Sequence, residues 1–151
     1  MDERTKDLLM GWAEKYNDEQ YFREDPIAFP RQFFKNFRMG FCNRMDVEIS
    51  AVIAAHLAWG RRAMIVRDCT RAFDEMCWKP YDYVMNGEYR NDNTSLHRTV
   101  MWSEFASICT RIKDIYHQRG KNESHSLESL SDEDFRVKVF GQKPDKRAPN
   151  K

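Results

Sequence analysis

Long apolar runs are missing from this chain, and their absence excludes a membrane-spanning protein. A transmembrane helix needs about 20 consecutive apolar residues. The most apolar stretch, residues 47–59 (VEISAVIAAHLAW), is shorter and contains a glutamate and a histidine. The N-terminus, MDERTKDLLM, opens with charged residues and lacks the apolar core of a signal peptide. We therefore predict a cytoplasmic protein with no membrane partner.

Glycine, proline and cysteine are also scarce. Six glycines and five prolines among 151 residues argue against a β fold, which needs many turns. The four cysteines form no Cys-x-x-Cys pair, and none of the four histidines lies at zinc-ligand spacing from them. We expect buried, reduced thiols, no metal and no cofactor.

Net charge is small as well. The chain has 25 Lys and Arg against 24 Asp and Glu, a formal charge of +1, so no overall field attracts nucleic acid or an acidic membrane. Any binding of an anion must be local. The sequence also contains no P-loop, Rossmann glycine pattern, zinc signature or nucleophile–base pair. It does not decide whether the protein is an enzyme.

What the chain does contain is helical periodicity around one apolar segment. Wound at about 100° per residue, residues 47–59 are apolar on nearly every side, which is typical of a buried helix. Asp46 is its predicted N-cap. In the helix that follows Gly60, we expect Asp68 to lie on the polar side, opposite the core. Amphipathic patterns predict further helices over residues 3–16, 26–37 (short, or restarting at Pro30), 60–77, 80–85, 103–119 and 131–140.

These patterns predict an all-α fold, a single-domain orthogonal helical bundle of six to seven helices around a buried central helix. The helical domain spans residues 1–140. Residues 141–151 lack an apolar anchor and are predicted to form a mobile basic tail. Residues 96–101 are expected to be a short extended or turn-like connection. Four phenylalanines are predicted to add bulk to the core: Phe29, Phe33, Phe34 and Phe37.

Arg62 is the first candidate for a functional residue. The helical pattern places it between Ile65 and Cys69 on the apolar side, where an unpaired charge is costly. One interpretation is that Arg62 snorkels from the open first turn or pairs with an acid. The other is that it faces a cleft and binds a phosphate or another anion. Gly60 and Arg61 fit this second interpretation, because glycine permits close backbone approach and a helix N-terminus offers free N–H donors.

Trp59 and the sequence His97-Arg98-Thr99 complete the candidate site. Trp59 either stacks on a base or packs at the end of the central helix. His97, Arg98 and Thr99 offer an imidazole, a guanidinium and a hydroxyl, which suit phosphate contacts. The alternative is a local hydrogen-bonded turn in which Arg98 pairs with an acid.

Two polar residues of the central segment are expected to be structural. His56 is predicted to be a core histidine with satisfied hydrogen bonds. Glu48 is enclosed by Val52 and Ala55 and is predicted to pair with an arginine.

A family resemblance is carried by five segments: DPIAFP, AAHLAWGRRAMI, PYDYVMN, SLHRTV and PDKRAPNK. Together they resemble the N-terminal part of an uncharacterised bacterial family, a domain of unknown function. Members of that family are longer than this chain. Their second half carries an Asp/His-containing motif similar to the catalytic-Asp region of helix-hairpin-helix DNA glycosylases. The resemblance implies that residues 57–62 lie against DNA and that the presumed catalytic half is missing, as in a truncated product.

Taken with the basic residues, the resemblance favours a helical nucleic-acid-interacting module of DNA-glycosylase-like type, with DNA or RNA as its partner. Its predicted contact residues are Trp59, Gly60, Arg61, Arg62, His97, Arg98 and Thr99. The alternative is a non-catalytic helical scaffold or protein-interaction domain. A small-molecule enzyme using His97 as acid or base ranks third, because no partner motif accompanies it. A surface left open by the missing half favours a homo-oligomer.

Overall fold

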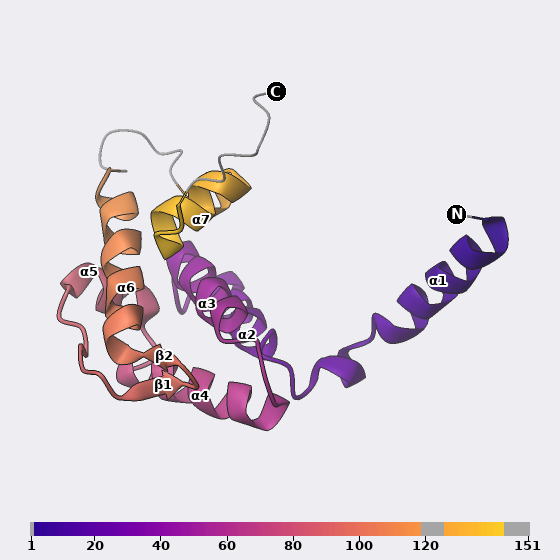
Figure 1. Ribbon diagram of the computed structural model, residues 1–151, viewed down its shortest axis with the longest axis horizontal. Helices are drawn as coiled ribbons and strands as arrows, with labels where there is room; N and C mark the ends of the chain where they lie inside the picture. Colours follow the sequence, from indigo (N-terminus) through magenta and orange to yellow (C-terminus); the bar gives the residue numbers. More distant parts are fainter. Residues whose placement is uncertain (1, 119–125, 144–151) are drawn as a thin grey trace.

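Seven α-helices make up most of the part of the chain that the computed structural model describes, residues 2–118 and 126–143 (Figure 1). The helices are α1 (Glu3–Tyr16), α2 (Ala28–Arg38), α3 (Arg44–His56), α4 (Arg62–Glu75), α5 (Pro80–Asn86), α6 (Trp102–His117) and α7 (Asp132–Phe140). Two short 3₁₀ helices, η1 (Glu19–Phe22) and η3 (Leu127–Ser129), and one hairpin, β1 (Ser95–His97) with β2 (Val100–Met101), connect them. The predicted bundle of six to seven helices is confirmed. None of the described helices is long and apolar enough to cross a membrane.

Helix α3 is the central helix. It packs against α2 and α5 and lines a cleft together with α6 and α7. Its buried side chains include Ile49, Val52 and Ile53, as the apolar pattern predicts. The helix ends at His56, so Trp59 lies beyond it, in the connection to α4. The helix is not buried on every side, contrary to the prediction from its apolar pattern. Ala51 and Ala55 are exposed and face a cleft instead of the core.

The predicted N-cap of α3 is wrong by three residues. Asn43 is the N-cap, and its side-chain oxygen accepts a hydrogen bond from the Asp46 amide at 2.9 Å. Asp46 returns the bond, accepting from the Asn43 amide at 3.0 Å, which completes a capping box. The other carboxylate oxygen of Asp46 accepts from the Tyr81 amide at 2.9 Å. Asp46 therefore ties the start of α3 to the start of α5.

Helix α4 is amphipathic, but one of its polar residues faces inward. Ile65, Cys69 and Phe73 are buried, as predicted. Asp68 was expected on the solvent side, yet only 1% of it is exposed. The reason is that the β1–β2 hairpin packs on α4 and brings His97 to the Asp68 carboxylate.

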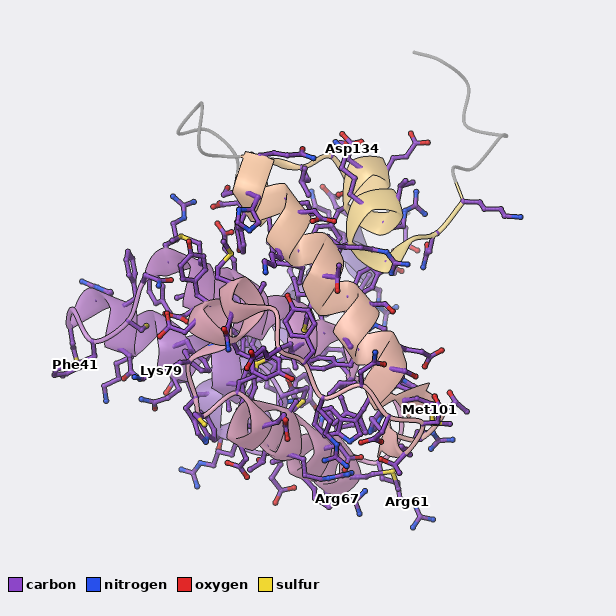
Figure 2. All side chains as sticks on the ribbon, turned by 90° about the vertical axis from the view of Figure 1, so that its left-hand side faces the viewer. Phe41, Arg61, Arg67, Lys79, Met101 and Asp134 are labelled. Atoms are coloured by element: carbon purple, nitrogen blue, oxygen red, sulfur yellow. The ribbon has the colours of Figure 1, made fainter. Side chains whose placement is uncertain are left out.

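The core is formed mainly by α3, α4 and α6, with aromatic rings at one end. The Phe33 ring is tilted against the Phe73 ring at a centroid distance of 5.3 Å, and the Phe29 ring lies 5.1 Å from the same Phe73 ring. Phe34 and Phe37 were expected to add to this core but are exposed, because only one side of α2 faces α3. Beyond the end of α2, Phe41 points outward at the edge of the molecule (Figure 2).

The four cysteines are free. Cys69 and Cys109 are buried, and burial raises the pKa of both thiols to about 12. Cys77 is exposed, and Cys42 is partly buried. The expectation of buried thiols therefore holds for Cys69 and Cys109 and is wrong for Cys77, which follows the end of α4.

Helix α1 is separate from this core. Every residue of α1 belongs to the described part of the chain, and none of them is buried. Figure 1 shows α1 extending away from the rest of the molecule, connected to it through η1. Asp2 caps its N-terminus by accepting a hydrogen bond from the Thr5 amide at 2.8 Å. The predicted tail, 141–151, falls largely outside the described residues, as does the predicted stop of α6 at Gly120.

Candidate functional site

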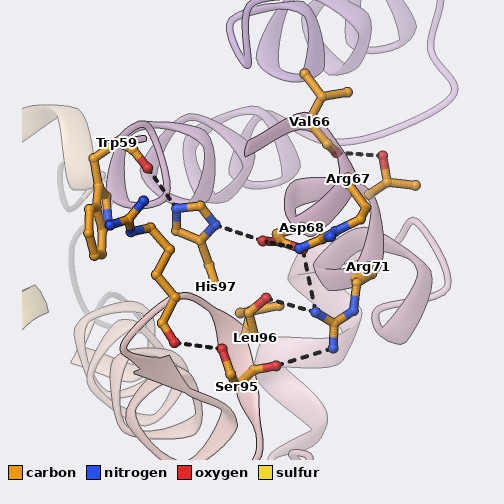
Figure 3. Close-up of polar contacts among 10 residues, drawn as sticks. Trp59, Val66, Arg67, Asp68, Arg71, Ser95, Leu96 and His97 are labelled. Carbon is orange, nitrogen blue, oxygen red and sulfur yellow. Dashed lines mark hydrogen bonds and ion pairs between the residues drawn. The ribbon is translucent and has the colours of Figure 1, made fainter. Parts of the chain in front are cut away.

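The candidate site forms where the connection between α3 and α4 meets the β1–β2 hairpin (Figure 3). Arg98 begins the two-residue turn of the hairpin and has a φ of +53°. Its guanidinium carbon lies 4.7 Å from the centre of the Trp59 ring. Such a cation–π contact stabilises by about 0.5–1 kcal/mol at an exposed site. Trp59, Gly60, His97 and Arg98 thus come together although they are distant in sequence.

Gly60 is the residue that permits this contact. Its φ of +107° is accessible mainly to glycine. A Cβ at this position would lie 3.1 Å from Arg98 Nη1 and 3.4 Å from Arg98 Cδ. The group that approaches the Gly60 backbone is therefore Arg98 of the same chain.

His97 is fully buried and uses both ring nitrogens within the protein. Nδ1 lies 2.8 Å from Asp68 Oδ2, and Nε2 lies 2.9 Å from the carbonyl oxygen of Trp59. Both ring nitrogens therefore face protein oxygens, one from the Asp68 carboxylate and one from the Trp59 carbonyl. Because no ring nitrogen is left for a substrate, the structure argues against His97 as a catalytic acid or base and makes it a structural link between β1, α4 and Trp59.

Asp68 is the centre of this polar network. Arg67 Nε lies 2.8 Å and Arg71 Nη1 lies 3.4 Å from its Oδ1 atom. Burial raises the pKa of the Asp68 carboxyl, but the hydrogen bonds from Arg67, His97 and Arg71 outweigh it and hold the pKa below its usual value. Arg71 also donates to the carbonyl oxygens of Leu96, at 2.9 Å, and Ser95, at 3.2 Å (Figure 3). The network fixes the hairpin, and therefore Arg98, on α4.

A comparison with known protein families identifies the family of this chain. Residues 25–142 match the family model DUF2400, described as a protein of unknown function. The chain belongs to the DUF2400 family. The match begins after α1 and η1 and includes every helix from α2 to α7. No curated protein and no solved structure matches the chain.

Arg61 and Arg62 of this DUF2400 chain lie at the start of α4, and both are exposed. Arg62 is exposed, as in the interpretation that it lies in an open first turn, because the core covers α4 only from Ile65 onward. Among the described residues, neither arginine side chain has a hydrogen-bond or ion-pair partner. Figure 2 shows Arg61 pointing outward at the edge of the molecule. Within the described ranges, no side chain caps the N-terminus of α4.

Thr99 is the second residue of the hairpin turn and lines a neighbouring cleft instead of the Trp59–Arg98 contact. This cleft lies between α3, α6 and α7 and has a volume of about 1010 Å³. His56 is also on its wall, half-buried, with its ring stacked on Phe140 at 5.0 Å. Burial lowers the pKa of His56. The expectation of a hydrogen-bonded core histidine is therefore wrong, since in the described structure the ring packs on Phe140 and has no hydrogen-bond partner.

Glu48 has the structural role that the sequence indicates. Its side chain is 9% exposed, and Arg44 Nε lies 3.6 Å from Oε1. Oε2 accepts hydrogen bonds from the Tyr116 hydroxyl at 2.9 Å and from the Leu127 amide at 3.0 Å. Glu48 thereby joins α3, α6 and η3 at one end of the cleft.

The polar network of DUF2400 residues around His97 was only partly visible in the sequence. Asp68 was expected on the polar side of its helix, and neither Asp68 nor Arg71 was proposed as a partner of His97. Nothing in the local pattern identifies them, because His97 lies 29 residues from Asp68. Among the described residues, no group of three or more His, Cys, Asp or Glu side chains is arranged to hold a metal ion.

Proposed function

We propose that this DUF2400 chain binds the phosphate backbone of nucleic acid at a basic corner formed by Arg61, Arg62 and Arg98. The observation that carries the proposal is the position of Arg98, which rests on the Trp59 ring and not on a carboxylate. Arg61 and Arg62 are exposed and follow Gly60 directly in the chain, and the exposed side chain of Arg98 lies against Gly60, so all three arginines are attached to the same junction.

The backbone of α4 adds to the attraction for an anion at this corner. None of the described side chains caps its first turn, and the amides of Met64 and Ile65 donate to the Arg61 carbonyl, so the amides of Arg62 and Ala63 are the ones available to an external acceptor. The partial positive charge of a helix N-terminus also favours a phosphate there. With a formal net charge of only +1, the whole protein supplies little long-range attraction, and the contact depends on these local groups.

DNA is the polymer that the family resemblance favours. The resemblance to helix-hairpin-helix DNA glycosylases implies that residues 57–62 lie against DNA, and this range includes Trp59, Arg61 and Arg62. The proposal is limited to binding, because both nitrogens of His97 are occupied and no catalytic group has been identified at the corner.

Salt dependence tests the proposal directly. We expect the affinity for a labelled DNA duplex, measured by fluorescence anisotropy, to fall with rising salt, with a log–log slope of about −3 for three phosphate contacts. The triple variant Arg61→Ala, Arg62→Ala, Arg98→Ala should lose at least about tenfold in affinity at low salt and most of that slope. A labelled RNA strand measured in parallel shows which polymer is preferred.

A second triple variant with the same change in charge provides the control. Arg23, Arg38 and Arg136 are exposed and lie on other parts of the molecule. Replacing these three by alanine should leave binding nearly unchanged. Equal losses in the two triple variants would show that binding depends on total charge alone, and the basic corner would then be the wrong site.

A further inference from the structure

We propose that the cleft between α3, α6 and α7 receives helix α1 of a second copy of this chain, and that reciprocal docking produces a symmetric dimer. This inference is independent of nucleic-acid binding. It rests on two surfaces of the described structure that complement each other: an apolar stripe on α1 and an apolar cleft with acidic residues along it.

The stripe on α1 consists of large apolar side chains that lie outside the core. At 100° per residue, four of them fall within about 100° of one another. They are between 45% and 53% exposed: Leu8, Leu9, Trp12 and Tyr16. A contiguous exposed apolar surface of this kind marks an interaction site. Of these four, Tyr16 touches another ring, that of Tyr21 in η1, at 5.1 Å.

Charged residues on α1 are sorted around this stripe. Arg4 and Lys15 border it on one side, and Lys6 lies toward the other side. The acidic residues project from the opposite side of the helix: Glu3, Asp7 and Glu14. The side of α1 that presents the stripe is therefore both apolar and bordered by positive charge.

The cleft has the opposite character. Its apolar lining comes mainly from side chains on α3, α6, α7 and η3, among them Val52, Ile108, Leu127, Phe135 and Phe140. The charged residues that line the cleft are three glutamates (Glu48, Glu104 and Glu128) and one arginine, Arg111. Arg44 pairs with two of these acids, Glu48 and Glu128, whereas Glu104 has no ion-pair partner among the described residues.

The two surfaces also match in length. Glu48 and His56 lie at the two ends of the α3 wall and are eight residues apart, about 12 Å along a helix. Leu8 and Tyr16 are also eight residues apart, so the stripe on α1 is as long as the α3 wall of the cleft, about two helical turns. An amphipathic helix that lays its apolar face into a groove is a common mode of peptide recognition.

The position of α1 favours docking on another molecule. Figure 1 shows α1 extending away from the body, whereas the cleft lies among α3, α6 and α7. If α1 of each copy enters the cleft of the other, the same contact forms twice and closes a two-fold dimer. The exposed face of α2 is a poorer partner for α1, because its charged residues Arg31, Lys35 and Arg38 are basic, like the borders of the stripe.

Two variants test the proposal from its two sides. The change Leu8→Glu with Trp12→Glu removes the stripe, and Ala55→Arg places a long cation in the cleft at a residue that is exposed, so the fold should be retained. We expect a dimer for the unchanged chain by sedimentation velocity. Each variant should raise the dimer dissociation constant by about tenfold or more, with an unchanged circular dichroism spectrum.

The control is Phe34→Glu, which introduces the same type of change on the exposed face of α2. It should leave the dimer intact. A mixture of the stripe variant and the cleft variant should associate more strongly than either alone, because it contains one intact stripe and one intact cleft. A monomeric unchanged chain at all concentrations, a dimer insensitive to Ala55→Arg, or a dimer lost in Phe34→Glu would each overturn the proposal.

Discussion

At the scale of single residues, the decisive feature is the buried pair of Asp68 and His97. Both side chains are almost fully removed from solvent, and their 2.8 Å contact joins α4 to β1. The helical period placed Asp68 on the polar side, since a periodic pattern records the average environment of a helix face and not a partner from a distant hairpin. The two interpretations of Arg62 could not be separated for a related reason, because the pattern does not show where the core begins to cover the first turn.

Replacing Asp68 by asparagine should destabilise the protein by about 3 kcal/mol, because it removes a buried carboxylate that accepts from Arg67 and Arg71 and contacts His97. Since the pKa of Asp68 is lowered in the folded protein, its stabilising contribution is complete above the unfolded value of about 3.8 and is lost as pH falls through the lower folded value. Urea unfolding between pH 2 and 7 should therefore show a smaller acid loss in Asp68→Asn than in the unchanged chain.

Asp92→Asn is the matched control for that experiment. Asp92 is also an acid with a lowered pKa, about 2, owing to hydrogen bonds from Thr94 and Arg90, but its side chain is 43% exposed, against 1% for Asp68. Its replacement should change stability little, because exposed ion pairs contribute little. If the two variants behave alike, the Asp68–His97 pair does not have the structural importance assigned to it here.

At the scale of elements, the helices were predictable and their ends less so. Amphipathic periods identified α1, α4 and α6 with nearly correct bounds, because each of these patterns extends over three or more turns. The start of α3 was placed at the wrong residue, since Asn43 and Asp46 are both good cap residues and the choice depends on the reciprocal bonds between them. The two-residue turn at Arg98 carries no glycine or asparagine, so its hairpin has no strong sequence signal.

Gly60→Ala tests how the connection between α3 and α4 supports the hairpin. A Cβ at φ +107° is strained and meets Arg98 at 3.1 Å, so we expect a loss of about 1–3 kcal/mol in stability and a displaced Arg98. Thermal unfolding measures the loss of stability. Tryptophan fluorescence reports the displacement of Arg98 from Trp59, and the change seen in Arg98→Ala is the reference to which the change in Gly60→Ala is compared. Gly11→Ala, on α1 with open space around it, should not destabilise.

At the scale of the whole molecule, the fold class followed from the sequence, whereas the separation of α1 did not. The amphipathic pattern over residues 3–16 correctly predicted a helix, but it did not determine whether the apolar face of that helix is buried, because an apolar face does not specify its partner. The candidate site was similarly divided: Trp59 and Arg98 meet, while Thr99 lines the separate cleft.

If the cleft binds α1 of a second copy, unfolding must depend on protein concentration. The midpoint temperature of the unchanged chain should rise as its concentration increases, because mass action favours the folded dimer. The variant Leu8→Glu with Trp12→Glu should show a midpoint that is independent of concentration. Differential scanning calorimetry over a hundredfold range of concentration makes the comparison, and a flat midpoint for the unchanged chain would contradict the dimer.

The way in which Arg98 is held has a consequence for recognition in general. A carboxylate that orders an arginine also cancels its electrostatic potential, so the ordered group attracts a passing anion less. An indole face restricts the same side chain through its quadrupole and adds no negative charge. Trp59 therefore reduces the entropy that Arg98 would lose on contact with an anion, while the positive field of Arg98 remains directed at the solvent.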